Sequence, residues 1–73
     1  MSVANVEKLQ ARKHRAGQVA ALKLWAAHKA LTNFTSACAD VGEGPKAIDD
    51  GRVLLAEQIA EYARYLQSVF PAD

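Results

Sequence analysis

Two histidines and one cysteine, His14, His28 and Cys38, are the residues of this chain whose side chains suit metal binding or nucleophilic chemistry. On a helix His14 and His28 would share roughly one side, but about 21 Å of helix would separate them, which is too far for one shared ion. Neither histidine has a second ligand three or four residues away, and Cys38 has no base at motif spacing. We therefore expect no metal site, and we expect Cys38 to be a small buried residue rather than a nucleophile.

The carboxylates Glu57 and Glu61 are four residues apart, which puts both on one helix face, as an acid/base pair would require. Arg64 follows three residues after Glu61 and alanines lie around the pair, a pattern typical of a solvated outer surface. Gly42-Glu43-Gly44-Pro45 is a turn that contains an acid, not a phosphate-binding loop. The sequence therefore predicts a protein that is not an enzyme and that binds no cofactor.

A basic cluster of Lys8, Arg12, Lys13 and Arg15 is the most distinctive local feature. Several cations on one helix can bind nucleic acid by releasing its counterions. Helical spacing places Lys8, Arg12 and Arg15 on one side and Lys13 on another. No aromatic residue is interleaved for base stacking, and no turn and recognition helix accompanies the cluster. Nucleic-acid binding is therefore the alternative interpretation, and a solvated or partner-facing surface is the leading one.

A long helix must carry most of these residues. The stretch from Ser2 to Asp40 contains no proline, one glycine and many alanines, which predicts a single helix over about residues 2–40. Gly17 lowers the helix propensity locally, so a break near it, which would produce three helices in all, is the alternative.

A turn over residues 41–45 and a second helix over about residues 46–69 are predicted to follow. Asp49 or Asp50 is an alternative start for this helix, and Pro71 stops it. The whole chain, residues 1–73, is therefore predicted to be one all-α domain, an antiparallel two-helix hairpin with a longer first helix.

The apolar residues of each helix recur every three or four positions, as a helix that faces a core requires. The stripe of the first helix is Val6, Leu9, Ala16, Ala20, Leu24, Ala27, Leu31, Phe34 and Cys38. The second helix has a heptad-like seam of Ile48, Arg52, Leu55, Ile59, Tyr62, Leu66 and Val69, with Val53, Ala56, Ala60, Ala63 and Phe70 beside it. Pairing across the turn joins residues whose numbers sum to about 86, which leaves room for Phe70 at Gly17. We expect core and dimer contacts from Leu24, Leu31, Phe34, Leu55, Ile59, Tyr62, Leu66 and Phe70.

Self-association follows from the small size of the chain. A domain of this size rarely gains more than about 3–5 kcal/mol from its own core, and a single cysteine cannot form an intrachain disulfide. The first helix would also extend about 20 Å beyond the second, and Val3, Val6 and Leu9 lie on that extension. We expect a homodimer with two-fold symmetry that forms a four-helix bundle.

The two halves of the chain carry opposite net charges. The net charge is +1. Residues 1–40 carry six cations and two acids, or +4, and residues 41–73 carry three cations and six acids, or −3.

Neither a signal peptide nor a long apolar run occurs in the sequence, so we expect a cytoplasmic protein with no membrane contact.

In architecture the chain resembles the small phage-encoded helical-hairpin proteins that dimerise and inhibit host regulators, such as the phage anti-activators of bacterial quorum sensing. The resemblance rests on the long helix over residues 2–40, the Gly42-Glu43-Gly44-Pro45 turn and the shorter helix that ends at Val69. It implies binding to a host transcription factor or to another host protein in order to block it.

A dimeric adaptor or inhibitor that binds another protein through its helix surfaces is therefore the leading hypothesis for the function. The candidate partner-binding residues are Val6, Leu9, Arg12, Arg15, Trp25 and Tyr65. The alternative is a small dimeric nucleic-acid-binding protein that uses the basic first helix, and a third possibility is a structural subunit of a larger assembly.

Overall fold

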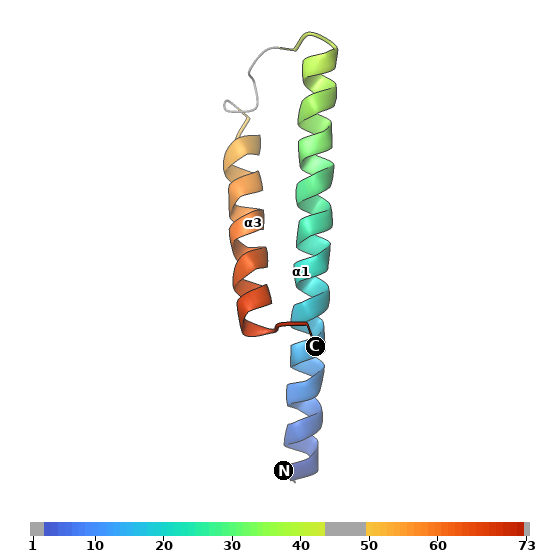
Figure 1. The fold of residues 1–73 in the computed structure, drawn as a ribbon, viewed down its shortest axis with the longest axis vertical. Coiled ribbons are helices and arrows are strands. Elements are labelled where there is room, and N and C mark those ends of the chain that lie inside the picture. The colour runs from blue at the N-terminus through green and yellow to red at the C-terminus, as the bar shows by residue number, and fades with distance from the viewer. Residues whose placement is uncertain (1–2, 44–49, 73) are drawn as a thin grey trace.

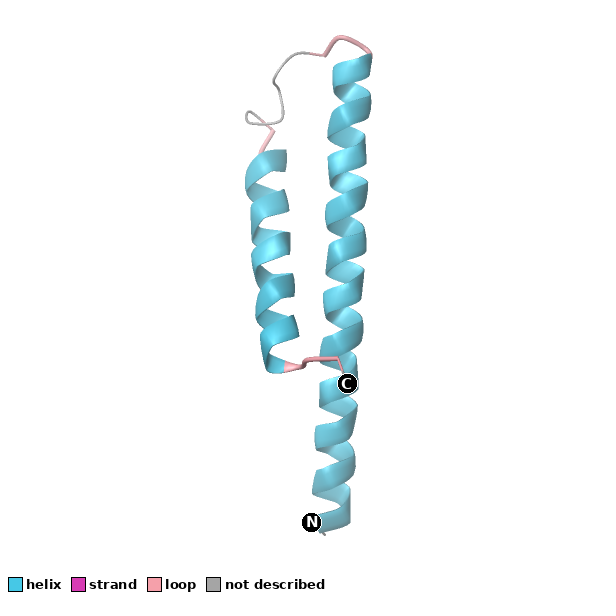
Figure 2. Ribbon diagram, viewed as in Figure 1, coloured by secondary structure: helices cyan, strands magenta, loops and turns pink. Residues whose placement is uncertain are grey.

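A computed structural model describes residues 3–43 and 50–72 of the chain. These described residues form two helices, α1 (Val3–Asp40) and α3 (Arg52–Val69), which run antiparallel and side by side (Figure 1). All regular structure in the described residues is helical (Figure 2). The predicted all-α hairpin with a longer first helix is confirmed. The molecule is a rod with extents of 60 × 17 × 17 Å.

Helix α1 is continuous through Gly17, so the alternative with a break there is not observed. The helix ends just before Gly42, whose φ of 80° is the left-handed conformation that glycine adopts without strain. The Glu43 N–H donates to the Cys38 carbonyl oxygen at 3.1 Å, and the Gly42 N–H donates to that of Ala39 at 3.0 Å. These two bonds form a Schellman motif, which satisfies carbonyl groups that the helix end leaves unpaired.

Helix α3 begins at Arg52 because Gly51, at its N-cap, is left-handed with a φ of 78°. Asp50 precedes the helix, and its carboxylate accepts a hydrogen bond from the Arg52 backbone N–H at 3.1 Å. The predicted start near residue 46, and Ile48 of the predicted seam, lie outside the described residues. The helix ends at Val69, and Pro71 follows directly after the C-cap residue Phe70.

The two helices meet along a seam that repeats every three or four residues. In α1 the seam is His14, Gly17, Ala21, Leu24, His28, Leu31, Thr35 and Cys38, all buried or half-buried. In α3 it is Arg52, Ala56, Ile59, Ala63, Leu66 and Phe70. Both sets step alternately by three and four, as in antiparallel helix pairs with coiled-coil packing.

This seam encloses a very small core. In residues 3–43 and 50–72 the buried apolar side chains are Ala21, Ala60, Ala63 and Leu66, of which only Leu66 is large. Thirteen large hydrophobic side chains of the same residues stay exposed: Val3, Val6, Leu9, Val19, Leu22, Phe34, Val41, Val53, Leu54, Leu55, Tyr62, Tyr65 and Val69. The hairpin therefore covers little of its own apolar surface.

The seam differs from the predicted one in which side chains it uses. The sequence prediction placed Leu55, Tyr62 and Val69 in it, and the structure leaves all three about half exposed beside it. Ala56 and Ala63 occupy the seam in place of Leu55 and Tyr62, because small side chains let two helix backbones approach closely, and Phe70 occupies it in place of Val69. In α1 the predicted stripe members Ala16, Ala27 and Phe34 are likewise exposed, whereas Leu24 and Leu31 are half-buried as seam residues.

The predicted contact between Gly17 and Phe70 is confirmed. A Cβ atom on Gly17 would lie 2.7 Å from Phe70 Cγ, so the Phe70 ring occupies the space that any larger residue at position 17 would need. This contact sets the register of the hairpin at its open end.

Candidate protein-binding surfaces

Two flanks lie beside the seam, one on each side of the hairpin. Because a helix turns by about 100° per residue, the residue after a seam position lies on one flank and the residue before it on the other. The residues after seam positions of both helices share one side, since Thr32 and Ser36 of α1 line a groove together with Val53 and Glu57 of α3. The groove has a volume of about 410 Å³.

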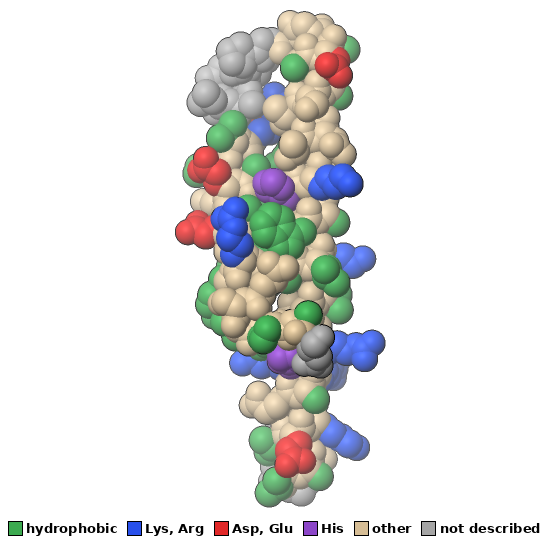
Figure 3. Space-filling model, in the orientation of Figure 1, with side chains coloured by type: hydrophobic (Ala, Val, Ile, Leu, Met, Phe, Trp, Pro, Cys, Tyr) green, Lys and Arg blue, Asp and Glu red, His purple; other side chains and the backbone are tan. Residues whose placement is uncertain are grey.

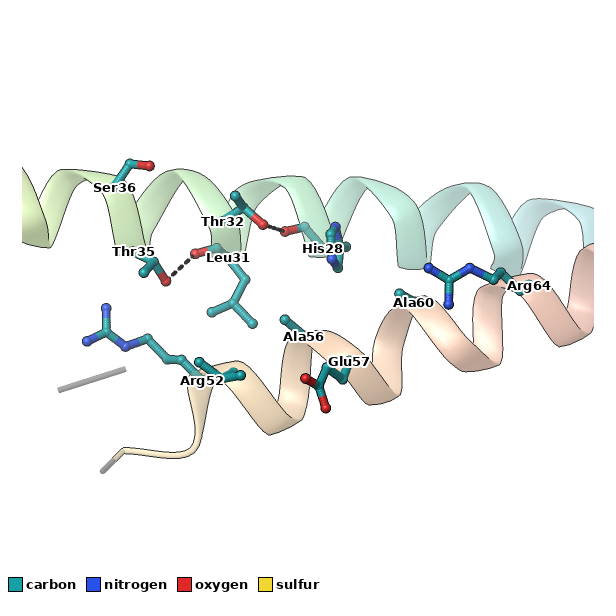
Figure 4. Close-up of a pocket in the computed structure, with 11 residues that line it drawn as sticks. His28, Leu31, Thr32, Thr35, Ser36, Arg52, Ala56, Glu57, Ala60 and Arg64 are labelled. Carbon is teal, nitrogen blue, oxygen red and sulfur yellow. Dashed lines mark hydrogen bonds between the residues drawn. The ribbon is translucent and has the colours of Figure 1, made fainter. Parts of the chain in front are cut away.

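The side with the groove, here named the groove flank, consists of Trp25, Thr32, Ser36, Val53, Glu57, Ala60 and Arg64. Leu31 and Ala56 point toward each other across the groove, and Arg52 and Arg64 lie at its opposite ends (Figure 4). Both threonine hydroxyls beside it donate to the backbone of α1, Thr32 to the His28 carbonyl at 2.9 Å and Thr35 to that of Leu31 at 3.0 Å. Both threonine O–H groups are therefore already used in hydrogen bonds within α1.

Arg64 and Trp25 close one end of the groove. The Arg64 guanidinium carbon lies 5.7 Å from the centroid of the Trp25 ring, within the range of a cation–π contact. The same ring packs edge to face against His28, with centroids 5.6 Å apart. Trp25, predicted to be an exposed anchor, is thus half-buried and already has two partners on this chain.

Arg52 closes the other end and joins three elements near the turn. Its Nε lies 2.6 Å from Asp50 Oδ2, its Nη1 donates to Cys38 Sγ at 3.2 Å, and its guanidinium carbon lies 5.1 Å from the centre of the Phe34 ring. The bond from Arg52 holds the pKa of Asp50 below its ordinary value, and the same bond raises the pKa of Arg52. The sequence prediction places Arg52 in the heptad-like seam and assigns it no partner, although Asp50, an acid two residues earlier, is a visible signal.

The opposite side, here named the apolar flank, consists of the residues that precede seam positions. The apolar residues among them are Ala16, Ala20, Ala27, Ala30, Phe34 and Ala37 in α1, and Leu55, Tyr62, Tyr65 and Val69 in α3. Exposed fractions of the large ones range from 45% for Val69 to 56% for Tyr62. The rings of Tyr62 and Tyr65 lie 5.5 Å apart. Lys23 and Gln58 are the polar residues at flank positions between Ala20 and Val69, so this side carries very little charge.

The N-terminal part of α1 projects beyond the end of α3 (Figure 1). Gln18 Nε2 donates to the Pro71 carbonyl oxygen at 2.8 Å, and the His14 ring packs edge to face on Phe70 with centroids 5.7 Å apart. Residues 3–13 lie beyond these contacts and are all exposed. This segment, here named the overhang, confirms the predicted extension of the first helix past the second.

The overhang combines apolar and basic side chains. Val3 is 75% exposed, Val6 44% and Leu9 53%, and the exposed cations Lys8, Arg12 and Lys13 lie among them. On the face shown in Figure 3, most basic side chains lie along α1, and acidic side chains lie on the outer edge of α3 and toward both ends of α1. The overhang therefore exposes apolar and basic side chains together, and α3 does not extend alongside it.

Three separate surfaces hold the six predicted partner-binding residues. Val6, Leu9 and Arg12 lie on the overhang, with exposed Arg15 just above it. Trp25 lies on the groove flank and Tyr65 on the apolar flank. The structure thus brings four of the six together and separates the two aromatic residues from them and from each other.

Comparisons with protein families, with curated proteins and with solved structures return no match to this chain. The function must therefore be inferred from the surfaces of the two helices. Within residues 3–43 and 50–72, no group of three His, Cys, Asp or Glu side chains is placed to hold a metal ion. Neither helix of the described part combines the length and apolar content needed to cross a membrane.

Proposed function

We propose that this protein is a non-enzymatic adaptor or inhibitor that forms a homodimer, completes a four-helix bundle in doing so, and binds another protein. One observation carries the proposal: among the described residues the hairpin buries four apolar side chains and leaves thirteen large hydrophobic side chains exposed. A chain that folds as a two-helix rod needs further helices to cover such surface.

The chain exposes more surface than a compact monomer of the same mass would. A compact monomer of 7.9 kDa would expose about 4,400 Å², from the scaling of surface with mass, and this chain exposes 5777 Å². The excess of about 1,400 Å² is larger than the roughly 800 Å² that each partner contributes to a standard interface. One chain therefore has enough surplus surface for a second copy and for part of another protein.

The overhang is the surface that we assign to the other protein. Val6 and Leu9 lie three residues apart, the spacing of anchors on a helix that enters a hydrophobic groove, and Lys8, Arg12 and Arg15 would favour an acidic rim around that groove. The resemblance to phage anti-activators suggests a regulatory protein, such as a transcription factor of a host cell, as the partner.

Nucleic-acid binding is the second candidate, because Lys8, Arg12, Lys13 and Arg15 are all exposed near the free end of α1. Retention on nucleic acid that weakens with salt would support it. The variant Arg12→Glu/Arg15→Glu would then lose retention, whereas survival of full activity in that variant would favour protein binding.

Affinity capture with three versions of the protein tests the proposal. The wild type, the overhang variant Val6→Glu/Leu9→Glu and the control Val19→Glu, an exposed residue of α1 outside the overhang, are each immobilised and offered a lysate. We expect a protein that the wild type and the control retain and the overhang variant does not, and that purified protein rebinds. If no protein depends on the overhang for retention, the assignment of this surface is wrong.

A further inference from the structure

We infer that the apolar flank is the surface on which two copies of this chain meet, about a two-fold axis parallel to the long axis of the hairpin. The inference rests on the homodimer of the proposed function, and it adds which face is used and how the copies are oriented. The groove flank and the overhang then stay free in the dimer.

The apolar flank is self-complementary in side-chain size. Its α1 half is mostly alanine, with Ala20, Ala27, Ala30 and Ala37, and its α3 half is large, with Leu55, Tyr62, Tyr65 and Val69. A two-fold axis parallel to the helices places α3 of each copy on α1 of the other, so that large side chains meet small ones twice. An axis perpendicular to the helices would instead pair alanines with alanines and leave gaps.

The register within the dimer follows from the register within the hairpin. Gly17 lies level with Phe70, and an axis parallel to the helices preserves height along the rod. Tyr62 of one copy then lies within two residues of the height of Ala27 of the other, and Leu55 lies between the heights of Ala30 and Phe34. Tyr62 and Tyr65 already pack together, with rings 5.5 Å apart, which limits the side-chain freedom lost on association.

Charge distinguishes this face from the other two surfaces. Between Ala16 and Val69, Lys23 is the one charged residue at the described flank positions, whereas the groove flank carries Glu57 and Arg64 and the overhang carries Lys8, Arg12 and Lys13. Two overhangs brought together would repel each other, and two groove flanks would desolvate charges that Trp25 and solvent now stabilise. A second copy is therefore the occupant that fits the apolar flank.

Neighbouring leucines of α3 provide a matched test. Leu55 lies on the apolar flank at 50% exposure, and Leu54 points away from both α1 and that flank at 60% exposure. Sedimentation velocity compares the wild type with Leu55→Glu and Leu54→Glu. We expect Leu55→Glu to raise the dimer dissociation constant about thirtyfold or more, as for an interface hot spot, and Leu54→Glu to leave it within a few-fold of the wild type.

Cysteine cross-linking tests the orientation without disrupting the fold. In a Cys38→Ser background, Ala27→Cys protein is mixed with Tyr62→Cys protein, and in a control with Glu61→Cys, whose position lies off the flank. We expect a disulfide-linked dimer from the mixture of positions 27 and 62, and much less from the control mixture or from either variant alone.

The possible results of these two experiments contradict different parts of the inference. A monomeric wild type would overturn the homodimer of the proposed function and this inference with it. A dimeric wild type that Leu55→Glu does not weaken would overturn the inference alone. A dimer that Leu55→Glu weakens but that cross-links through position 27 to itself would overturn the parallel axis.

Discussion

Replacing Gly17 by alanine should destabilise the protein, although alanine is the better helix former. In a helix interior the change alone gains about 1 kcal/mol. The added Cβ would lie 2.7 Å from Phe70 Cγ, closer than atoms approach without displacement, so the end of α3 must move. Overpacking of this kind costs about 1–3 kcal/mol. The expected balance is a loss of about 1 kcal/mol in the free energy of unfolding, from the difference of these two terms.

A double-mutant cycle separates the two terms. In a Phe70→Ala background the ring is gone, so Gly17→Ala should stabilise by about 1 kcal/mol, which makes the coupling between the two sites about 2 kcal/mol. Ala16→Gly is the control, because Ala16 is exposed and should lose about 1 kcal/mol in either background. Urea unfolding followed by circular dichroism measures all variants at one protein concentration, since dimerisation makes the midpoint depend on concentration.

The sign of the change in the free energy of unfolding for Gly17→Ala shows whether the Phe70 ring occupies the space beside Gly17. A stabilised single variant, with the same gain in both backgrounds, would refute the close contact between Gly17 and Phe70 and with it the register of the hairpin.

Three further predictions follow from other contacts. Arg64→Ala should shift Trp25 fluorescence to longer wavelength, because the guanidinium that lies over the ring is lost; an unchanged spectrum would contradict that contact. The bond from Arg52 lowers the pKa of Asp50 in the folded state. The ionised Asp50 carboxylate therefore stabilises the fold fully above the unfolded pKa of about 3.9, and this stabilisation is lost as the pH falls through the lower folded pKa. In the variant Asp50→Asn the free energy of unfolding, monitored by circular dichroism, should depend less on pH in that range. Deleting residues 3–11 should leave the molecule dimeric in sedimentation, and a monomer would place the overhang in the dimer interface.

The elements of the fold could be predicted because strong local signals specify them. The proline-free, alanine-rich run predicted α1 within a residue at each end, and Gly42 predicted its C-terminus. The start of α3 was harder to predict, because Asp49, Asp50 and Gly51 each permit a helix to begin nearby.

The orientation of the helices could not be predicted from apolar periodicity. Alanines such as Ala20, Ala21, Ala26 and Ala27 lie on every side of α1, so several stripes are nearly equally apolar. In α3 the prediction favoured Leu55 and Tyr62, whereas close helix packing selected the neighbouring Ala56 and Ala63. The contact of Arg52 with Cys38 joins residues 14 positions apart and depends on the hairpin being folded.

The mass of the wild-type protein in solution tests the central claim most directly. Light scattering coupled to size exclusion, at low and high salt and with and without nucleic acid, would measure it at micromolar concentration. The account predicts a dimer, twice the 7.9 kDa of one chain, that neither salt nor nucleic acid changes. A well-folded monomer would contradict the claim that a second copy covers the exposed apolar surface. A complex with nucleic acid that salt dissociates would instead support nucleic-acid binding through the basic side chains of the overhang.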